Sequence, residues 1–140
     1  MVDVDGVGHK ISGETALFQA AWQGFVEVVR FLVEEGKADV HKAQASTGCT
    51  PLWQAAQNGH TEVVRFLVEE GKADVDKVNK KNQTPINIAA FCGHLEVVQF
   101  LLGKGADCTI ENQWGRTPLA TAQKQGHAEV AAALKSHARR

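Results

Sequence analysis

The sequence predicts an all-α solenoid of stacked helix-turn-helix units, and three observations support that prediction. A phrase of threonine, then proline or alanine, then leucine or isoleucine occurs four times, and each copy runs on to a glycine. The threonines that open it lie 35, 34 and 33 residues apart, at Thr15, Thr50, Thr84 and Thr117. Residues 27–40 recur without change as residues 62–75. A period this regular indicates identical supersecondary units that stack on one another.

The first helix of each unit is predicted to begin at its threonine. In the second unit, Thr50 caps the helix, and Pro51 follows at the first helical position, where its missing N–H costs nothing. Leu52 and two alanines then form an apolar stripe at helical spacing, with side chains small enough for a neighbouring helix to approach closely. Gly59 is expected to end this helix in the left-handed conformation.

The second helix starts after that glycine and has a wider apolar face. Glu62 lies in its first turn, where the helix dipole favours negative charge. Gly71 is expected to end it, and residues 72–83 form a polar connector. The apolar face consists of Val63, Val64, Phe66 and Leu67. Two helices this short cannot bury their apolar faces alone, so the units must stack.

One domain, residues 1–140, is predicted to contain a tail at residues 1–14 and four units. The units are residues 15–45, 46–79, 80–112 and 113–140, and the last includes a C-terminal cap. Alanines at 131–133 replace bulky residues, as expected of a capping unit. The first unit shows no such replacement of bulky residues and contains the aromatic residues Phe18, Trp22, Phe25 and Phe31. This edge has three interpretations: an upstream repeat has been removed, the N-terminal tail covers the edge, or the edge self-associates. We favour the first, in which the chain is a fragment of a longer array.

Composition and charge exclude several classes of partner. The net charge of −1, from 15 basic and 16 acidic residues, creates no field that would attract nucleic acid or an anionic membrane. No apolar run approaches the length of a membrane span, and the N-terminus lacks the features of a signal peptide. Cys49, Cys92 and Cys108 are odd in number and lack disulfide spacing. We therefore expect a soluble cytoplasmic or nuclear protein that binds no membrane, with nucleic acid an unfavoured partner.

Residues suited to catalysis or metal binding form no recognisable site in the sequence. His60, His94 and His127 recur at the interval of the repeat, which favours a structural role at the start of each second helix. Cys92 lies two residues before His94, but no further ligand pair with metal-site spacing accompanies them. The glycines mostly mark helix ends and form no phosphate-binding loop. We expect no enzyme activity, no catalytic residue, no metal and no cofactor.

The repeated sequence pattern resembles that of a known family. The chain repeats Thr-Pro-Leu-x-x-Ala-Ala-x-x-Gly-His-x-Glu-Val-Val-x-x-Leu, closed by Gly-Lys-Ala-Asp, and this resembles the ankyrin repeat in four copies over about residues 13–135. The resemblance implies a helix pair with a projecting β-hairpin in each unit, and a concave groove lined by the hairpins and first helices. It implies that the chain holds another protein and has no enzymatic activity. Lys37 and Lys72 each add a residue after a glycine, so those hairpin tips are expected to differ from the family's standard turn.

The candidate partner contacts are residues that are not required for packing between the repeats. By the resemblance, the hairpin residues before each threonine and the two residues before each first-helix glycine face the groove. Tryptophan and arginine there are typical of binding hot spots. Phe18 and Trp53 replace the family's usual histidine, so packing between repeats and partner contact are equal alternatives for them; Trp22 and Phe91 have the alternative of folding back over the next repeat. The candidate contacts are Trp22, Gln23, Trp53, Gln57, Asn58, Lys80, Lys81, Phe91, Trp114 and Arg116.

Charge along this predicted groove is uneven. Basic residues lie in the last two units, at Lys80, Lys81, Arg116 and Lys124, whereas the first unit has only Glu14. An aromatic first half and a basic second half suit an extended peptide that is acidic toward one end. The alternative is a solvated surface whose lysines bind nothing specific, and we favour it for Lys124. The predicted function is protein–protein interaction, as a scaffold or adaptor. The alternatives are a small anionic ligand or oligonucleotide bound by Lys80, Lys81, Trp114 and Arg116, a spacer within a longer array, and an engineered binding scaffold.

Overall fold

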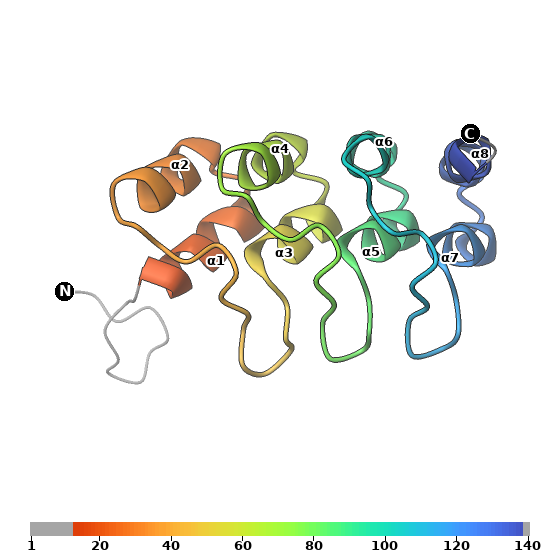
Figure 1. Cartoon of the computed structure of the whole chain (residues 1–140), viewed down its shortest axis with the longest axis horizontal. Coiled ribbons are helices and arrows are strands. Elements are labelled where there is room, and N and C mark those ends of the chain that lie inside the picture. Colours follow the sequence, from red (N-terminus) through yellow and green to blue (C-terminus); the bar gives the residue numbers. More distant parts are fainter. Residues whose placement is uncertain (1–12, 139–140) are drawn as a thin grey trace.

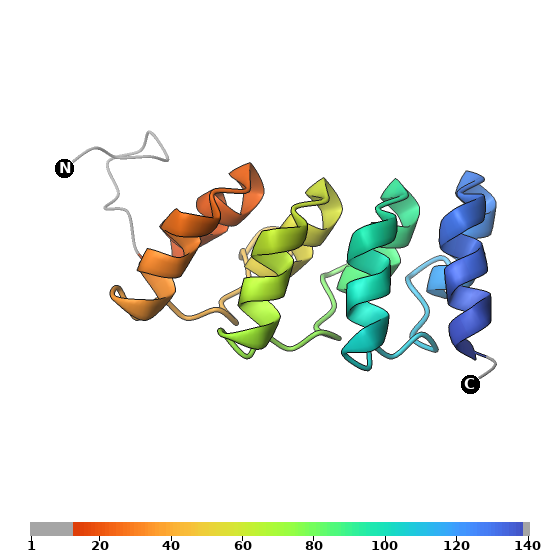
Figure 2. The same ribbon diagram turned by 90° about the horizontal axis from the view of Figure 1, so that it is seen from above.

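A computed structural model describes residues 13–138, and these residues form eight helices and no strand, which confirms the predicted all-α solenoid. Figure 1 shows the helices stacked in pairs along one direction, with the first helix of each pair in one layer and the second in another. From above, the second helices lie side by side (Figure 2). The first helices are α1 (Gly13–Gln23), α3 (Pro51–Asn58), α5 (Pro85–Cys92) and α7 (Pro118–Gln125). The second helices are α2 (Val26–Glu34), α4 (Thr61–Glu69), α6 (Leu95–Gly103) and α8 (Ala128–Ala138).

The N-terminal residues of the predicted tail, 1–12, lie outside the described part of the chain. The helix α1 begins at Gly13, two residues before the threonine at which the sequence pattern places the start of the first unit.

Threonine and glycine bound the first helices as predicted. The hydroxyl oxygens of Thr50, Thr84 and Thr117 accept from the backbone N–H three residues later, at 3.1–3.2 Å. A proline follows each threonine, and the glycine at the other end of each helix is left-handed, with φ between 74° and 78°. These local requirements explain why α3, α5 and α7 have the same length of eight residues.

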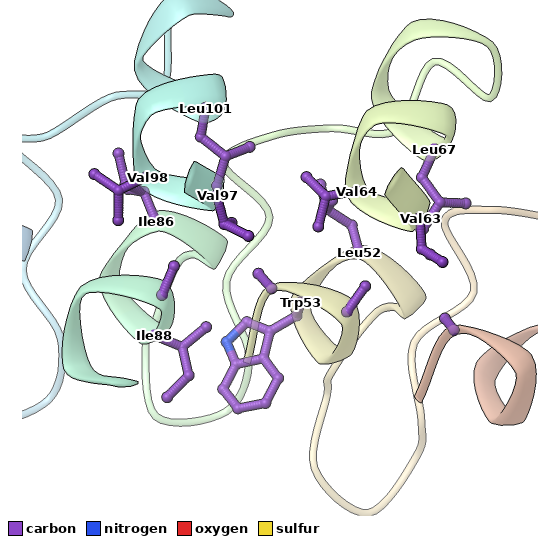
Figure 3. Close-up of a cluster of buried hydrophobic side chains, with 14 of the residues drawn as sticks. Leu52, Trp53, Val63, Val64, Leu67, Ile86, Ile88, Val97, Val98 and Leu101 are labelled. Carbon is purple, nitrogen blue, oxygen red and sulfur yellow. The ribbon is translucent and has the colours of Figure 1, made fainter. Parts of the chain in front are cut away.

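The core lies between the two layers and continues from one unit to the next. Figure 3 shows valines and leucines of α4 and α6 pointing down onto the first helices. Leu52, Leu67, Ile86 and Leu101 have no more than 1% of their surface exposed. Burying an aliphatic side chain of this size contributes about 1.5–3 kcal/mol, so the apolar stripes account for most of the stacking energy.

A histidine ring joins each unit to the one before it. Nε2 of His94 lies 2.8 Å from the backbone oxygen of Gln57, and the same bond links His60 and His127 to the preceding units. A carbonyl oxygen only accepts, so each ring donates its Nε2 proton. The ring also lies over the preceding glycine, because a Cβ on Gly59 would stand 2.7 Å from Nδ1 of His94. The Gly-His pair is therefore a stacking element.

The connectors before α3, α5 and α7 project from the first-helix layer as narrow hairpin-shaped turns (Figure 1). In the two later turns, the N–H of Asn79 and Asn112 donates across the base to the backbone oxygen of Gln83 and Arg116. Adjacent turns are joined by single backbone bonds, such as that from the N–H of Lys80 to the oxygen of Thr47, at 3.0 Å. The predicted hairpins therefore project as expected, but no strand is assigned to them within residues 13–138.

Gly71 follows the end of the second helix, which runs to Glu69, as predicted. Its φ is not positive, and Lys72 is left-handed instead, with φ 58°, as is Lys37 with φ 56°. In the third unit, Gly105 precedes the alanine-aspartate pair in the same way and is left-handed, with φ 81°. Lysine therefore takes the left-handed backbone conformation that favours glycine. Lys37 and Lys72, the added residues, thus turn the chain away from the end of the second helix and do not lengthen the hairpin tip.

Candidate protein-binding surface

A small hollow lies between the hairpin turns and the first helices of the third and fourth units. It measures about 30 Å³. Phe91, at the end of α5, and Trp114, on the turn before α7, both line it, together with Arg116 and Lys124. The other lining residues are Gln83, Asn112, Thr121 and Gln125. Three predicted contacts from two units, Phe91, Trp114 and Arg116, thus meet at one place.

The two aromatic rings at this hollow are open to solvent. The exposed fraction is 45% for Phe91 and 53% for Trp114. The ammonium group of Lys81 lies 6.0 Å from the centre of the Trp114 ring, which is a cation–π distance. Phe91 uses its backbone oxygen to accept from His127 and leaves its ring outside. Both rings are therefore available for contact with another molecule.

A buried polar network supports the hollow from below. Oδ1 of Asn87 accepts from the Thr121 hydroxyl at 2.9 Å and from Nδ2 of Asn112 at 3.4 Å. Nδ2 of Asn87 donates to the backbone oxygen of Arg116 at 3.1 Å. Asn112 in turn accepts from the backbone N–H groups of Trp114 and Arg116. Asn87 occupies the position of Phe18 and Trp53 in the first two units, so a polar side chain links the third and fourth units where an aromatic ring packs earlier in the stack.

The basic residues of this surface have no acidic partner among residues 13–138. Salt bridges in that range join Arg30 to Glu27 and Glu34, Lys104 to Glu69, and His41 to Asp39. Lys80, Lys81, Arg116 and Lys124 belong to none of them. Among the eight lining residues two are cations and none is a carboxylate, so the hollow has a positive character. The side chain of Glu14, the acid predicted at the opposite end, lies outside the described residues.

The first two units present a neutral surface. The Trp22 ring is 45% exposed and stands edge-on to Phe18, with ring centres 6.1 Å apart. Gln23 beside it is exposed, whereas Gln57 and Asn58 are half-buried. Asn58 donates from Nδ2 to the backbone oxygen of Trp22 at 2.9 Å, and Gln57 accepts from the amide of Gln54. The Asn58 amide therefore links two units, whereas the Gln57 amide bonds within α3.

The prediction that Trp53 contacts a partner is wrong. Only 5% of it is exposed, and Figure 3 shows its indole between α3 and α5 near Ile88. The position lies on the side of the first helix that the next unit covers, and Phe18, its counterpart in the first unit, is buried in the same way. Packing between repeats, one of the two alternatives for these rings, is what the structure shows.

Comparison with protein families decides the relationship. The sequence pattern of the ankyrin-repeat family, in three copies, matches residues 17–112. The chain belongs to the ankyrin-repeat family. The helix pair α7 and α8 lies beyond the matched range, yet its threonine cap and its histidine bond to the preceding unit are those of an ankyrin repeat. Ankyrin repeats are generally protein–protein interaction modules without catalytic activity. No curated protein matches the chain.

The described residues of this ankyrin array give little support to catalysis or metal binding. Burial raises the pKa of the Cys92 thiol, which keeps that group protonated and weakly nucleophilic. Burial and the carboxylates of Asp107 and Asp76 raise the pKa of Cys108 as well. Within residues 13–138, no three histidine, cysteine, aspartate or glutamate side chains gather where they could hold a metal ion. None of the described helices is long and apolar enough to cross a membrane.

The first ankyrin unit exposes a second apolar surface, on α2. Val28 and Phe31 are 46% and 61% exposed, whereas their counterparts Val63 and Phe66 in α4 are buried. The guanidinium of Arg30 covers the Phe66 ring at 4.8 Å, and Phe31 has no such cover among the described residues. Phe25, also exposed, stands where later units have histidine, so the bond that joins the other units has no counterpart at this edge.

Proposed function

We propose that this chain is a non-catalytic module that holds a protein or an extended peptide on the face shared by its hairpin turns and first helices. The observation that carries the proposal is the exposure of three large aromatic rings, those of Trp22, Phe91 and Trp114. Exposed aromatic rings beside polar side chains are typical of protein contact surfaces. Trp22 and Phe91 end first helices two units apart, so a partner that touches both extends along the stack.

Replacing Trp22 and Trp114 by alanine together is expected to abolish capture of the partner. A hot-spot side chain contributes about 2 kcal/mol or more, which corresponds to about a 30-fold loss of affinity for each ring. The experiment compares proteins captured from cell extract by the wild type and by the double variant, followed by calorimetric titration of the captured protein. A second double variant, Phe25→Ala with Phe31→Ala, removes exposed aromatic rings at the edge of the stack and serves as the control. A spacer would lose no captured protein in either variant, and that outcome contradicts the proposal.

We also propose that the apolar edge formed by Phe25, Val28 and Phe31 binds a second copy of the chain. Phe31 corresponds in sequence to Phe66, whose ring is covered by Arg30 of α2, so the edge continues an interface already used inside the stack. Light scattering is expected to show a rise in mass with concentration for the wild type and none for Phe31→Lys. A Phe91→Lys variant, changed on the other surface, is expected to associate like the wild type. A wild type that stays monomeric at every concentration contradicts this proposal.

A further inference from the structure

We propose that the hollow between Phe91 and Trp114 receives an aspartate or glutamate side chain of the partner, which makes the partner a segment with an acid placed over the third and fourth units. This inference rests on the proposed function and adds to it the chemistry that the surface selects. Its basis is the charge, the size and the rigidity of the hollow, taken in turn.

The charge of the hollow lacks its complement within the described chain. Arg116 and Lys124 line it, Lys81 stands over the Trp114 ring, and no residue in the lining is acidic. A hollow on the second-helix side differs, because there Arg30 and Arg65 are accompanied by four glutamates, Glu27, Glu62, Glu69 and Glu70. Cations without internal partners, next to exposed aromatic rings, favour a negatively charged group from outside.

The size of the hollow selects among negatively charged groups. Its volume of about 30 Å³ is small, a little above the roughly 10–15 Å³ that one water molecule needs. A carboxylate can reach into such a space while the rings of Phe91 and Trp114 cover its methylene groups, whereas a nucleotide base is too large to be enclosed in it. The planar guanidinium of Arg116 matches the two oxygens of a carboxylate, which favours a bidentate pair. The space therefore fits an acidic side chain better than an oligonucleotide.

The backbone of Arg116 is held in place before any partner arrives. Its backbone N–H donates to Oδ1 of Asn112 at 3.1 Å, and its backbone oxygen accepts from Nδ2 of Asn87 at 3.1 Å and from the N–H of Asn112 at 3.0 Å. A fixed backbone lowers the ordering cost of binding. The neutral residues Trp22 and Gln23 at the other end contribute no charge, so the acid requirement applies to one end of the partner.

Selection of peptides tests the inference directly. A displayed library of random twelve-residue peptides is selected on the wild type, on Arg116→Gln with Lys124→Gln, and on a control with Lys42→Gln and Lys77→Gln. The control removes two exposed cations away from the hollow. We expect aspartate or glutamate to be enriched at one position in peptides from the wild type and the control only. In a synthetic peptide, replacing that acid by its amide is expected to weaken binding at least tenfold to the wild type and not to the Arg116/Lys124 variant.

The outcomes separate this inference from the proposed function. Peptides that need Trp22 and Trp114 but show no acidic preference overturn the inference and leave the proposed function standing. A wild type that selects no peptide and captures no protein overturns both. A twelve-residue oligothymidylate that binds through Arg116 and Lys124 more tightly than any selected peptide overturns the acidic side chain as the occupant.

Discussion

Gly93→Ala is expected to lower the free energy of unfolding by about 3 kcal/mol, because the added methyl group meets two separate obstacles. Gly93 has a φ of 77°, a left-handed conformation in which alanine costs about 1–2 kcal/mol. The new Cβ would also lie 2.8 Å from Nδ1 and Cε1 of the His127 ring. If the ring moves away, it loses its bond to the Phe91 backbone oxygen, worth about 1 kcal/mol. Urea unfolding followed by circular dichroism measures the loss.

Gly126→Ala is the matched control for that prediction. Gly126 ends α7 with a φ of 78°, and no atom lies within 4 Å of the place where its Cβ would stand. Only the backbone penalty remains, so we expect a loss of about 1–2 kcal/mol. Equal losses in the two variants would mean that contact between ring and glycine contributes nothing to stacking.

The helices could be predicted because each unit repeats local requirements that a short segment satisfies alone. Thr84 supplies the cap of α5, Pro85 its first position and Gly93 the left-handed end, and none of these depends on a neighbouring unit. Periodicity then shows which faces are apolar. The fold class and the structural role of the three histidines were within reach of the sequence for this reason.

The burial of single rings could not be predicted, because it depends on the neighbouring unit. Phe31 and Phe66 occupy the same place in two segments of identical sequence, yet 61% of the first ring is exposed and 4% of the second. Trp53 and Trp22 both lie on first helices, and only Trp53 faces a side that the next unit covers. Phe31 and Phe66 have the same residue type and place in the unit, so only the stacked structure distinguishes them, whereas Trp22 and Trp53 lie at different places, seven residues after Thr15 and three after Thr50.

The hollow itself was missed because its residues come from two units. Phe91 and Trp114 were predicted as contacts, but Asn112 and Thr121 beneath them were not. A signal was present in the sequence: Asn87 stands at a position that is aromatic in the first two units, and Thr121 one that is isoleucine in the third. Polar residues at two positions that face each other across a unit boundary indicate a buried hydrogen-bond network. Only the structure shows that these two side chains meet.

Asn87→Ala is expected to lower the free energy of unfolding by about 3 kcal/mol, since it leaves the Thr121 hydroxyl and Nδ2 of Asn112 without their partner and removes one of the two bonds to the Arg116 backbone oxygen. The side chain is 1% exposed and bonds to the Thr121 hydroxyl, to Nδ2 of Asn112 and to the backbone oxygen of Arg116. The same change removes one of the three bonds that hold the backbone of Arg116, so we also expect weaker binding of acidic peptides selected on the wild type. Urea unfolding and calorimetric titration measure the two effects on one preparation.

Asn58→Ala provides the comparison, because it removes the same chemical group at a half-buried site. Asn58 Nδ2 donates one bond to another unit, to the Trp22 backbone oxygen at 2.9 Å. Its loss is expected to cost about 0.5–1.5 kcal/mol. If Asn87→Ala costs no more than Asn58→Ala, the network under the hollow is worth one ordinary hydrogen bond, and Asn87 contributes little to the position of Arg116. A Thr121→Val change is then made in the wild type and in the Asn87→Ala variant. It is expected to destabilise the wild type and to be nearly neutral once Asn87 is gone.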